Sequence, residues 1–184
     1  MSQNSISFFQ VVGKLKTVKR TGWVNTGIKN PESVADHSYR LAVLCMVLGD
    51  QLKLNTEKLV RMALIDDLAE SLTGDLVVER GNKRVGDKDK KFELEQKAIT
   101  EIFQNIENGQ QYIELWQEAQ EGKSREAQIL TQLDKLEMAF QALEYEDQVD
   151  PKKLDEFWTN AQKYIDEKNL KSLFQKLLKL RSKN

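Results

Sequence analysis

Three carboxylates within five residues are the strongest chemical signal in this sequence. Asp66, Asp67 and Glu70 lie in the segment Ile-Asp-Asp-Leu-Ala-Glu (65–70), inside an expected helix that apolar residues surround on nearly all sides. Side chains three and four residues apart share a helical face, so the three carboxylates can converge on one side. Buried unpaired carboxylates are costly. We therefore expect a metal or another bound cation here, in preference to a salt-bridge cluster or a solvent-facing strip.

Two further polar residues interrupt apolar helical stripes elsewhere in the chain. His37 lies on a stripe with Leu41, and Asp134 lies in the segment Gln-Leu-Asp-Lys-Leu-Glu (132–137), with Met138 four residues away on its own face. Each alone is more simply interpreted as a core residue with satisfied hydrogen bonds. Together with the Asp-Asp pair, they make a mixed nitrogen–oxygen ligand set for a metal ion.

The composition limits which classes of protein and of metal site are possible. The 184 residues fit one domain, and 28 Lys+Arg against 29 Asp+Glu give a net charge of −1. This balance argues against a general binder of DNA, RNA or anionic membranes. The single histidine and single cysteine exclude a three-histidine metal site, a Cys-rich zinc module and an intramolecular disulfide.

The hydrophobic pattern predicts no membrane segment. The longest apolar run, residues 41–48, is far shorter than the ~20 residues that a spanning helix needs. Cys45 lies inside this run, where we expect a buried, reduced thiol. The first residues do not form a signal peptide, so we expect a cytoplasmic protein.

Helical periodicity runs through the chain and predicts an all-α fold of about seven to eight helices. No strand pattern competes with it. We expect a loop over 21–30 and an irregular basic loop over 77–89. We expect helices over 6–19, 31–52, 55–73, 90–108, 112–120, 124–143, from 150 onward, and over 170–180. Gly109 is expected to end the fourth of these helices, Ser124 to cap the sixth, and Asp150-Pro151 to start the seventh.

Five segments in order and spacing resemble the HD-domain phosphohydrolases, and specifically their 5′-deoxynucleotidase branch. The resemblance covers about residues 8–147, so that residues 1–184 would form a single HD domain with residues 148–184 as C-terminal helices packed on it. The segments are Arg-Thr-Gly-Trp (20–23), Pro-Glu-Ser-Val-Ala-Asp-His-Ser-Tyr-Arg (31–40), Met-Ala-Leu-Ile-Asp-Asp-Leu-Ala-Glu (62–70), Thr-Gly-Asp (73–75) and Gln-Leu-Asp-Lys-Leu-Glu-Met (132–138).

This resemblance implies an all-helical protein, usually a homodimer, that uses a divalent metal to hydrolyse deoxyribonucleoside 5′-monophosphates. The family's metal ligands correspond to His37, Asp66, Asp67 and Asp134. The chain departs from the family at Asp66, because the family has histidine at this position of its His-Asp pair. Apart from His37, no histidine is present to replace it.

The resemblance also implies roles for five further residues. Glu70 resembles the glutamate that orients the attacking water, and Asp75 resembles the acid that protonates the departing 5′-oxygen. Arg20 would bind the phosphate with its guanidinium. Trp23 resembles the residue beside the sugar, where its bulk would exclude a 2′-hydroxyl. Lys91 could reach the phosphate.

Asp66 leaves two outcomes open. If it still ligates, one imidazole and three carboxylates make a harder site, which favours Mn²⁺ or Mg²⁺ and leaves Co²⁺ possible. If the metal is lost, the chain is a catalytically impaired relative that binds nucleotide or acts as an interaction protein. The other matched positions are present, which favours retained hydrolysis. Another phosphoester, such as a nucleoside triphosphate or a cyclic nucleotide, also remains an alternative substrate.

Overall fold

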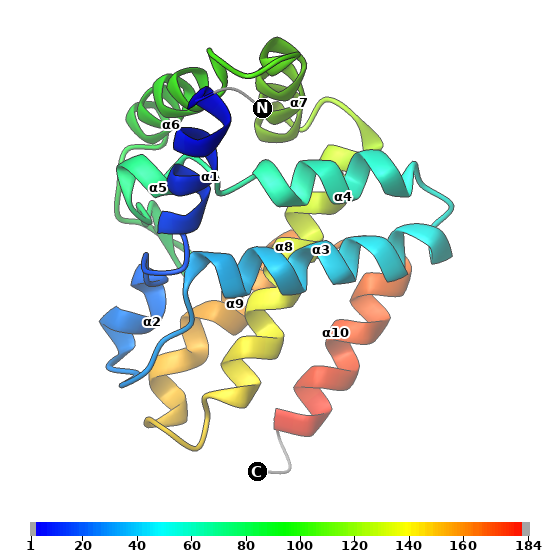
Figure 1. Ribbon diagram of the computed structural model, residues 1–184. Coiled ribbons are helices and arrows are strands. Elements are labelled where there is room, and N and C mark those ends of the chain that lie inside the picture. The colour runs from blue at the N-terminus through cyan, green and yellow to red at the C-terminus, as the bar shows by residue number, and fades with distance from the viewer. Residues whose placement is uncertain (1–2, 182–184) are drawn as a thin grey trace.

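The computed structural model describes residues 3–181. Within them the regular secondary structure is helical apart from one small hairpin (Figure 1). This confirms the expected all-α class. Eight of the helices in this part are ten residues or longer. The elements are α1 (Gln3–Lys14), α2 (Thr21–Thr26), α3 (Val34–Gln51), α4 (Thr56–Ile65), α5 (Glu70–Thr73), β1 (Glu79–Arg80), β2 (Lys83–Arg84), α6 (Lys88–Phe103), α7 (Gly109–Glu121), α8 (Arg125–Glu144), the 3₁₀ helix η1 (Pro151–Leu154), α9 (Asp155–Tyr164) and α10 (Lys168–Arg181).

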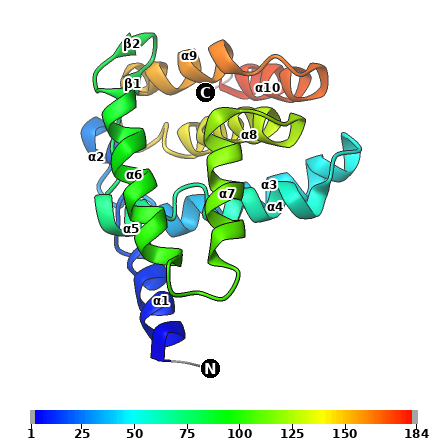
Figure 2. The same cartoon turned by 90° about the horizontal axis from the view of Figure 1, so that it is seen from above.

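Two apolar clusters hold the helices together. In the larger one, α3 and α4 lie side by side and α8 packs across them, with α9 and α10 on the far side of α8 (Figures 1 and 2). Leu41, Leu59 and Leu133 are fully buried there. In the smaller cluster, α1, the turn before α5, α6 and α7 pack around Ile99 and Trp116. No helix within residues 3–181 is long and apolar enough to cross a bilayer.

The start of α3 is fixed by a capping box. Ser33 accepts a hydrogen bond from the Asp36 N–H, and the Asp36 carboxylate in turn accepts from the Ser33 N–H at 2.8 Å. The helix was expected to begin at Pro31, but Ser33 satisfies the free N–H groups of its first turn, so it begins at Val34. His37 therefore lies in the first full turn after the cap, where its position depends on this end of the helix.

The expected continuous helix over 55–73 is wrong. Asn55 caps it, but α4 ends at Ile65 and a tight turn over 66–69 leads into the short α5. Several backbone bonds in and after this turn run from an N–H to the carbonyl three residues earlier, as from Glu70 to Asp67 at 3.0 Å. The Asp66 carbonyl, which lies in the turn, accepts the indole N–H of Trp116 at 3.1 Å instead. Leu64 and Leu72 are exposed, so this segment is also less buried than its composition indicates.

Three other boundaries differ from the expected ones. The loop over 21–30 contains α2, and the basic loop over 77–89 contains the antiparallel pair β1–β2, with Gly81 in its turn at φ +58°. The helix that Gly109 was expected to end, α6, stops at Phe103. Gly109 instead begins α7. Only glycine fits at this position, because a Cβ there would lie 2.1 Å from the Phe103 carbonyl oxygen.

Replacing Ser33 by alanine should lower the free energy of unfolding by about 1 kcal/mol, because the first turn of α3 loses its capping side chain. The measurement is urea unfolding of the metal-free protein. Ser38→Ala is the matched control, since Ser38 lies in the interior of the same helix and bonds only the Val34 carbonyl. An equal loss in both variants would contradict the importance of the cap.

Candidate metal centre and active site

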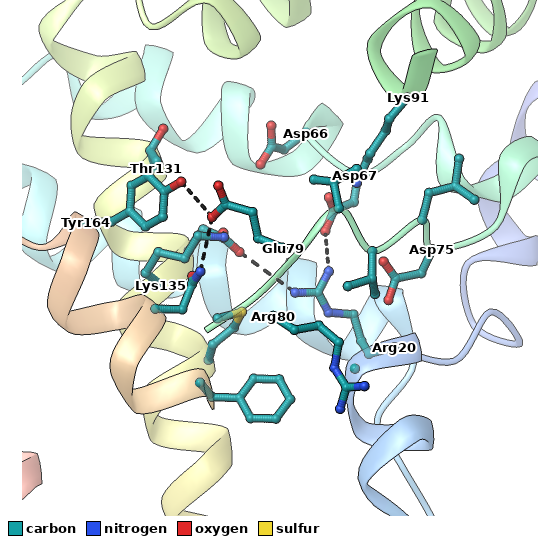
Figure 3. Close-up of a pocket in the computed structure, with 18 of the residues that line it drawn as sticks. Arg20, Asp66, Asp67, Asp75, Glu79, Arg80, Lys91, Thr131, Lys135 and Tyr164 are labelled. Atoms are coloured by element: carbon teal, nitrogen blue, oxygen red, sulfur yellow. Dashed lines mark hydrogen bonds and ion pairs between the residues drawn. The ribbon is translucent and has the colours of Figure 1, made fainter. Parts of the chain in front are cut away.

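A cavity of about 320 Å³ opens between α2, the turn over 66–69, α6, α8 and α9 (Figure 3). One wall carries the acidic residues of the turn and of α8. Glu79 of the hairpin also lines the cavity and accepts a hydrogen bond from the Tyr164 hydroxyl at 2.8 Å. Eight of the nine sequence-predicted site residues line the cavity: Arg20, Trp23, Asp66, Asp67, Glu70, Asp75, Lys91 and Asp134. The ninth, His37, lies directly behind Asp134.

His37 is the centre of the acidic wall. Its ring is fully buried, and Nε2 lies 3.1 Å from Asp134 Oδ1 and 3.5 Å from Asp67 Oδ2. Within the described residues, no hydrogen bond of acceptable geometry satisfies Nε2. A buried nitrogen lone pair that faces two carboxylates fits a divalent cation. These three side chains, from α3, the turn after α4, and α8, are therefore the residues that could hold a metal.

The charges around this group are compensated by basic residues. The Arg20 guanidinium lies 3.4 Å from Asp67 Oδ2 and 3.9 Å from Asp134 Oδ1, and Lys135 donates to Asp134 at 2.7 Å. Although burial alone would raise it, the pKa of Asp134 is held well below its usual range by Lys135, His37 and Arg20. Burial and Arg20 oppose protonation of His37, but Glu137 and Asp134 outweigh them and raise its pKa.

Asp66 lies in the same cavity but points away from Asp67 (Figure 3). Its Oδ1 accepts a hydrogen bond from Gln120 Nε2 at 2.8 Å. Burial, together with repulsion from Asp67 and Asp134, raises the pKa of Asp66 to about 8. Without a nearby cation, this carboxyl group therefore favours its protonated form at neutral pH.

Glu70 is a buried carboxylate with free coordination capacity. Its side chain is 1% exposed, and neither oxygen has a hydrogen-bond partner within the described part of the chain. The Lys91 ammonium lies 3.7 Å from Glu70 Oε1 and 3.3 Å from Glu95 Oε1. Burial and the negative charges of Asp67 and Asp75 raise the pKa of Glu70 well above its usual value. Glu70 is thus suited to accept a proton.

Asp75 and Trp23 border the cavity from the side of α2. The Asp75 carboxylate accepts the Thr21 N–H at 2.6 Å, and the Thr21 hydroxyl donates to the Asp75 carbonyl at 2.8 Å, so the two residues join α2 to the end of α5. Trp23 is 1% exposed, stacks on Phe157 at 3.9 Å between centroids, and donates to Glu32 at 2.8 Å. Trp23 is therefore a core residue that also forms part of the cavity wall.

Two residues that sequence reasoning left without a role complete the site. Glu137 Oε2 lies 2.5 Å from His37 Nδ1, and its Oε1 accepts from Arg40 Nε at 2.7 Å. The available signal was spacing, since Glu137 follows Asp134 by three residues and Arg40 follows His37 by three. Both lie inside the segments that carry the family resemblance.

Glu32, His37 and Glu137 also bring potential ligand atoms within 4.8 Å of one another. Two atoms bound to one metal through bonds of ~2.1 Å lie roughly 3 Å apart. The 2.5 Å separation between His37 Nδ1 and Glu137 Oε2 is instead that of a hydrogen bond. This cluster therefore orients the histidine from behind, and the metal-binding face of the ring is Nε2.

Comparisons with known proteins agree with this arrangement. A family model described as "HD domain" matches residues 12–177. A relative from Dictyostelium discoideum, named 5′-deoxynucleotidase HDDC2, is 43% identical over 154 residues, which cover 79% of each chain. The relative of the same name from Homo sapiens is 37% identical over 184 residues, covering 100% of this chain and 89% of its own.

The fold is also similar to solved structures. A conserved hypothetical protein from Pyrococcus furiosus superposes with a TM-score of 0.77 at 32% identity, covering 95% of this chain and 99% of its own. The PH0347 protein from Pyrococcus horikoshii gives 0.75 at 33% identity, covering 94% and 97%. From the match over residues 12–177 and these relatives, we conclude that the chain belongs to the HD-domain family.

Proposed function

We propose that this protein is a metal-dependent 5′-deoxynucleotidase that hydrolyses deoxyribonucleoside 5′-monophosphates to the deoxynucleoside and phosphate. The observation that carries the proposal is the buried His37 Nε2, which faces Asp67 and Asp134 without a hydrogen-bond partner among the described residues. The names of the curated relatives, at 33–43% identity over most of the chain, support the substrate class.

We propose that a single divalent ion is held by His37, Asp67 and Asp134, and that Asp66 becomes a fourth ligand by turning from Gln120 towards the ion when it binds. When bound, such an ion polarises the phosphate and lowers the pKa of a water molecule. Three carboxylates and one imidazole favour Mn²⁺ or Mg²⁺, with Co²⁺ possible. The raised pKa of Asp66 supports this proposal, because a cation would allow the carboxyl group to ionise.

The remaining side chains suit the other requirements of phosphomonoester hydrolysis. Glu70 would accept the proton of the water that attacks phosphorus, and Asp75 would give a proton to the 5′-oxygen as its bond to phosphorus breaks. The guanidinium of Arg20, at the start of α2, lies near Asp67 and Asp134 and would donate hydrogen bonds to the phosphate oxygens when substrate binds. Lys91 would add positive charge beside Glu70, and Trp23 would lie against the sugar.

Partners and location extend this proposal. A nucleotide substrate is consistent with a net charge of −1, which does not favour binding to a DNA or RNA polymer. We also propose a homodimer in the cytoplasm. Exposed apolar side chains at helical spacing on α3, namely Tyr39, Val43, Met46 and Val47, would suit contact with a second copy.

The first test is phosphate release from dAMP, dGMP, dCMP and TMP with Mn²⁺, Mg²⁺ or Co²⁺. We expect turnover with Mn²⁺ or Mg²⁺, and a fall in kcat of about 100-fold or more in Glu70→Gln, because glutamine cannot accept the proton. Glu101→Gln, an exposed residue of α6 outside the cavity, is the matched control. No turnover with any metal, alongside nucleotide binding that stabilises the fold, would make the chain an impaired relative.

Replacing Asp66 by histidine tests whether Asp66 is a working ligand. We expect activity with Mn²⁺ to fall and activity with Co²⁺ to rise, because a second imidazole makes the site softer. Activity should be measured with each ion in turn, with bound metal quantified by elemental analysis. A variant that gains cobalt-dependent turnover over a silent parent would instead identify Asp66 as the cause of lost function.

The metal-free protein should become less stable as pH rises from 6 to 8. Asp66 has a folded pKa of about 8, above its unfolded value, so its ionisation in this window favours the unfolded chain. The raised pKa of His37 acts in the same direction, because its stabilisation is present below its unfolded pKa and is lost as pH rises. Urea unfolding in the presence of a chelator at pH 6, 7 and 8 measures the slope.

Asp66→Asn should make this decline shallower, since asparagine does not titrate. Asp147→Asn, which changes an exposed aspartate remote from the cavity, should leave the decline as in the parent. The electrostatic interpretation would be wrong if the Asp66 variant and the parent lost stability in parallel.

A further inference from the structure

The proposed reaction makes no use of the buried carboxylate behind His37. Glu137 and His37 are both fully buried, and Glu137 Oε2 lies 2.5 Å from the ring nitrogen Nδ1, on the side opposite the cavity. The other oxygen of Glu137 accepts the Arg40 Nε–H at 2.7 Å. Each oxygen of Glu137 is therefore bound to one nitrogen, and neither is available to the cavity.

This pairing determines which ring nitrogen carries a proton. Arginine can only donate hydrogen bonds, so the oxygen that faces Arg40 must act as an acceptor. The second oxygen of an ionised Glu137 is also an acceptor, and Nδ1 must then be the donor. In the neutral imidazole that a metal requires, this leaves the lone pair on Nε2, the nitrogen that faces Asp67 and Asp134.

Arg40 is itself held by side chains of α8. Its NH1 donates to both carboxylate oxygens of Glu144, at 2.9 and 2.8 Å, and its NH2 donates to the side-chain amide oxygen of Gln141 at 2.7 Å. His37 and Arg40 lie one turn apart on α3, and Glu137 lies opposite them on α8. The guanidinium therefore cannot turn away from Glu137 without breaking several bonds between the two helices.

We propose that Glu137, held in place by Arg40, is a positioning residue for the metal centre. It fixes the tautomer and the orientation of His37, so that Nε2 is presented to the ion. Carboxylates that bind the second nitrogen of a ligating histidine commonly change metal affinity by about 10- to 100-fold when they are replaced. The inference rests on the proposed metal centre but not on the choice of substrate.

Glu137→Gln is the informative variant because Arg40 decides how the new amide must lie. The amide oxygen must face Arg40, which leaves the NH₂ group to donate to His37 Nδ1. The ring then carries its proton on Nε2, which points at the ion. We expect the Kd for Mn²⁺, measured by titration calorimetry on the full chain, to rise about 10- to 100-fold.

Removing the arginine should reverse this effect. In Arg40→Met/Glu137→Gln, the amide is free to turn its oxygen to Nδ1–H, and we expect the double variant to bind Mn²⁺ more tightly than Glu137→Gln alone. Arg40→Met alone supplies the background. Glu144→Gln is the matched control, because it changes a carboxylate that binds Arg40 but does not contact His37, and its Kd should stay within about twofold of the parent value.

The single histidine gives a direct readout without assignment. In ¹⁵N-histidine-labelled protein loaded with diamagnetic Zn²⁺, imidazole NMR should show the proton on Nδ1 and the metal on Nε2. In Glu137→Gln we expect the Nδ1–H signal to be lost, while thermal unfolding shows that the variant is folded. If that variant does not fold, the spectrum of the parent protein still decides which nitrogen carries the proton.

Four results would overturn the inference. The first two are a proton on Nε2 of His37 in the parent protein and an unchanged Kd for Mn²⁺ in folded Glu137→Gln. The third is a double variant that binds Mn²⁺ no more tightly than Glu137→Gln alone. The fourth is failure of the parent protein to bind either Mn²⁺ or Zn²⁺. If the ion binds and the tautomer is as expected but no nucleotide is hydrolysed, the proposed function fails and this inference stands.

Discussion

Negative charge gathered around one buried imidazole is the constraint that the rest of the structure must satisfy. Asp67 and Asp134 lie at one nitrogen of His37, and Glu137 lies at the other. Carboxylates removed from water must be paired or bound to a cation, because desolvation of an isolated charge costs more than the fold could supply. The helices that bring these groups together must therefore also bring positive charge.

The fold supplies this charge partly from elements that are distant in sequence and partly from α8 itself. Arg20 at the start of α2 lies close to both Asp67 and Asp134. Lys135 neutralises Asp134 from within α8, and Arg40 neutralises Glu137 from α3. Each of these cations is itself hydrogen-bonded or paired, so the cluster rigidifies the contact between α3 and α8. That rigidity is what a metal site needs, because ligand atoms must be in place before the ion binds.

The turn between α4 and α5 directs the adjacent carboxylates of Asp66 and Asp67 to different partners. Successive residues of a helix point about 100° apart, so the side chains of Asp66 and Asp67 leave the backbone in different directions. The structure directs Asp67 to His37 and Asp66 to Gln120, and the tight turn then buries Glu70 against Lys91. Asp66, the first of the two adjacent aspartates, thus lies at the point where α4 ends.

Much of the fold could be predicted because its signals are local. The periodicity of apolar residues predicts the helices, and Ser124 acts as an N-cap as expected, since capping depends only on a side chain and the next turn of backbone. The break at Ile65 could not be predicted in this way. In the turn, backbone N–H groups bond the carbonyl three residues earlier instead of four, and this change hardly alters the spacing of apolar residues. The Trp116 indole that bonds the Asp66 carbonyl lies fifty residues away in the sequence.

By itself, the sequence determined which groups could do chemistry: one histidine, and acidic residues on three helical segments where burial makes a carboxylate costly. Only the tertiary structure decided which atoms meet. It places Nε2 of His37 against Asp67 and Asp134, turns Asp66 aside, and sets Glu137 and Arg40 behind the ring. A charged residue on an amphipathic helix is usually solvated, so only the packing of α8 against α3 distinguishes Glu137 from an exposed glutamate such as Glu144.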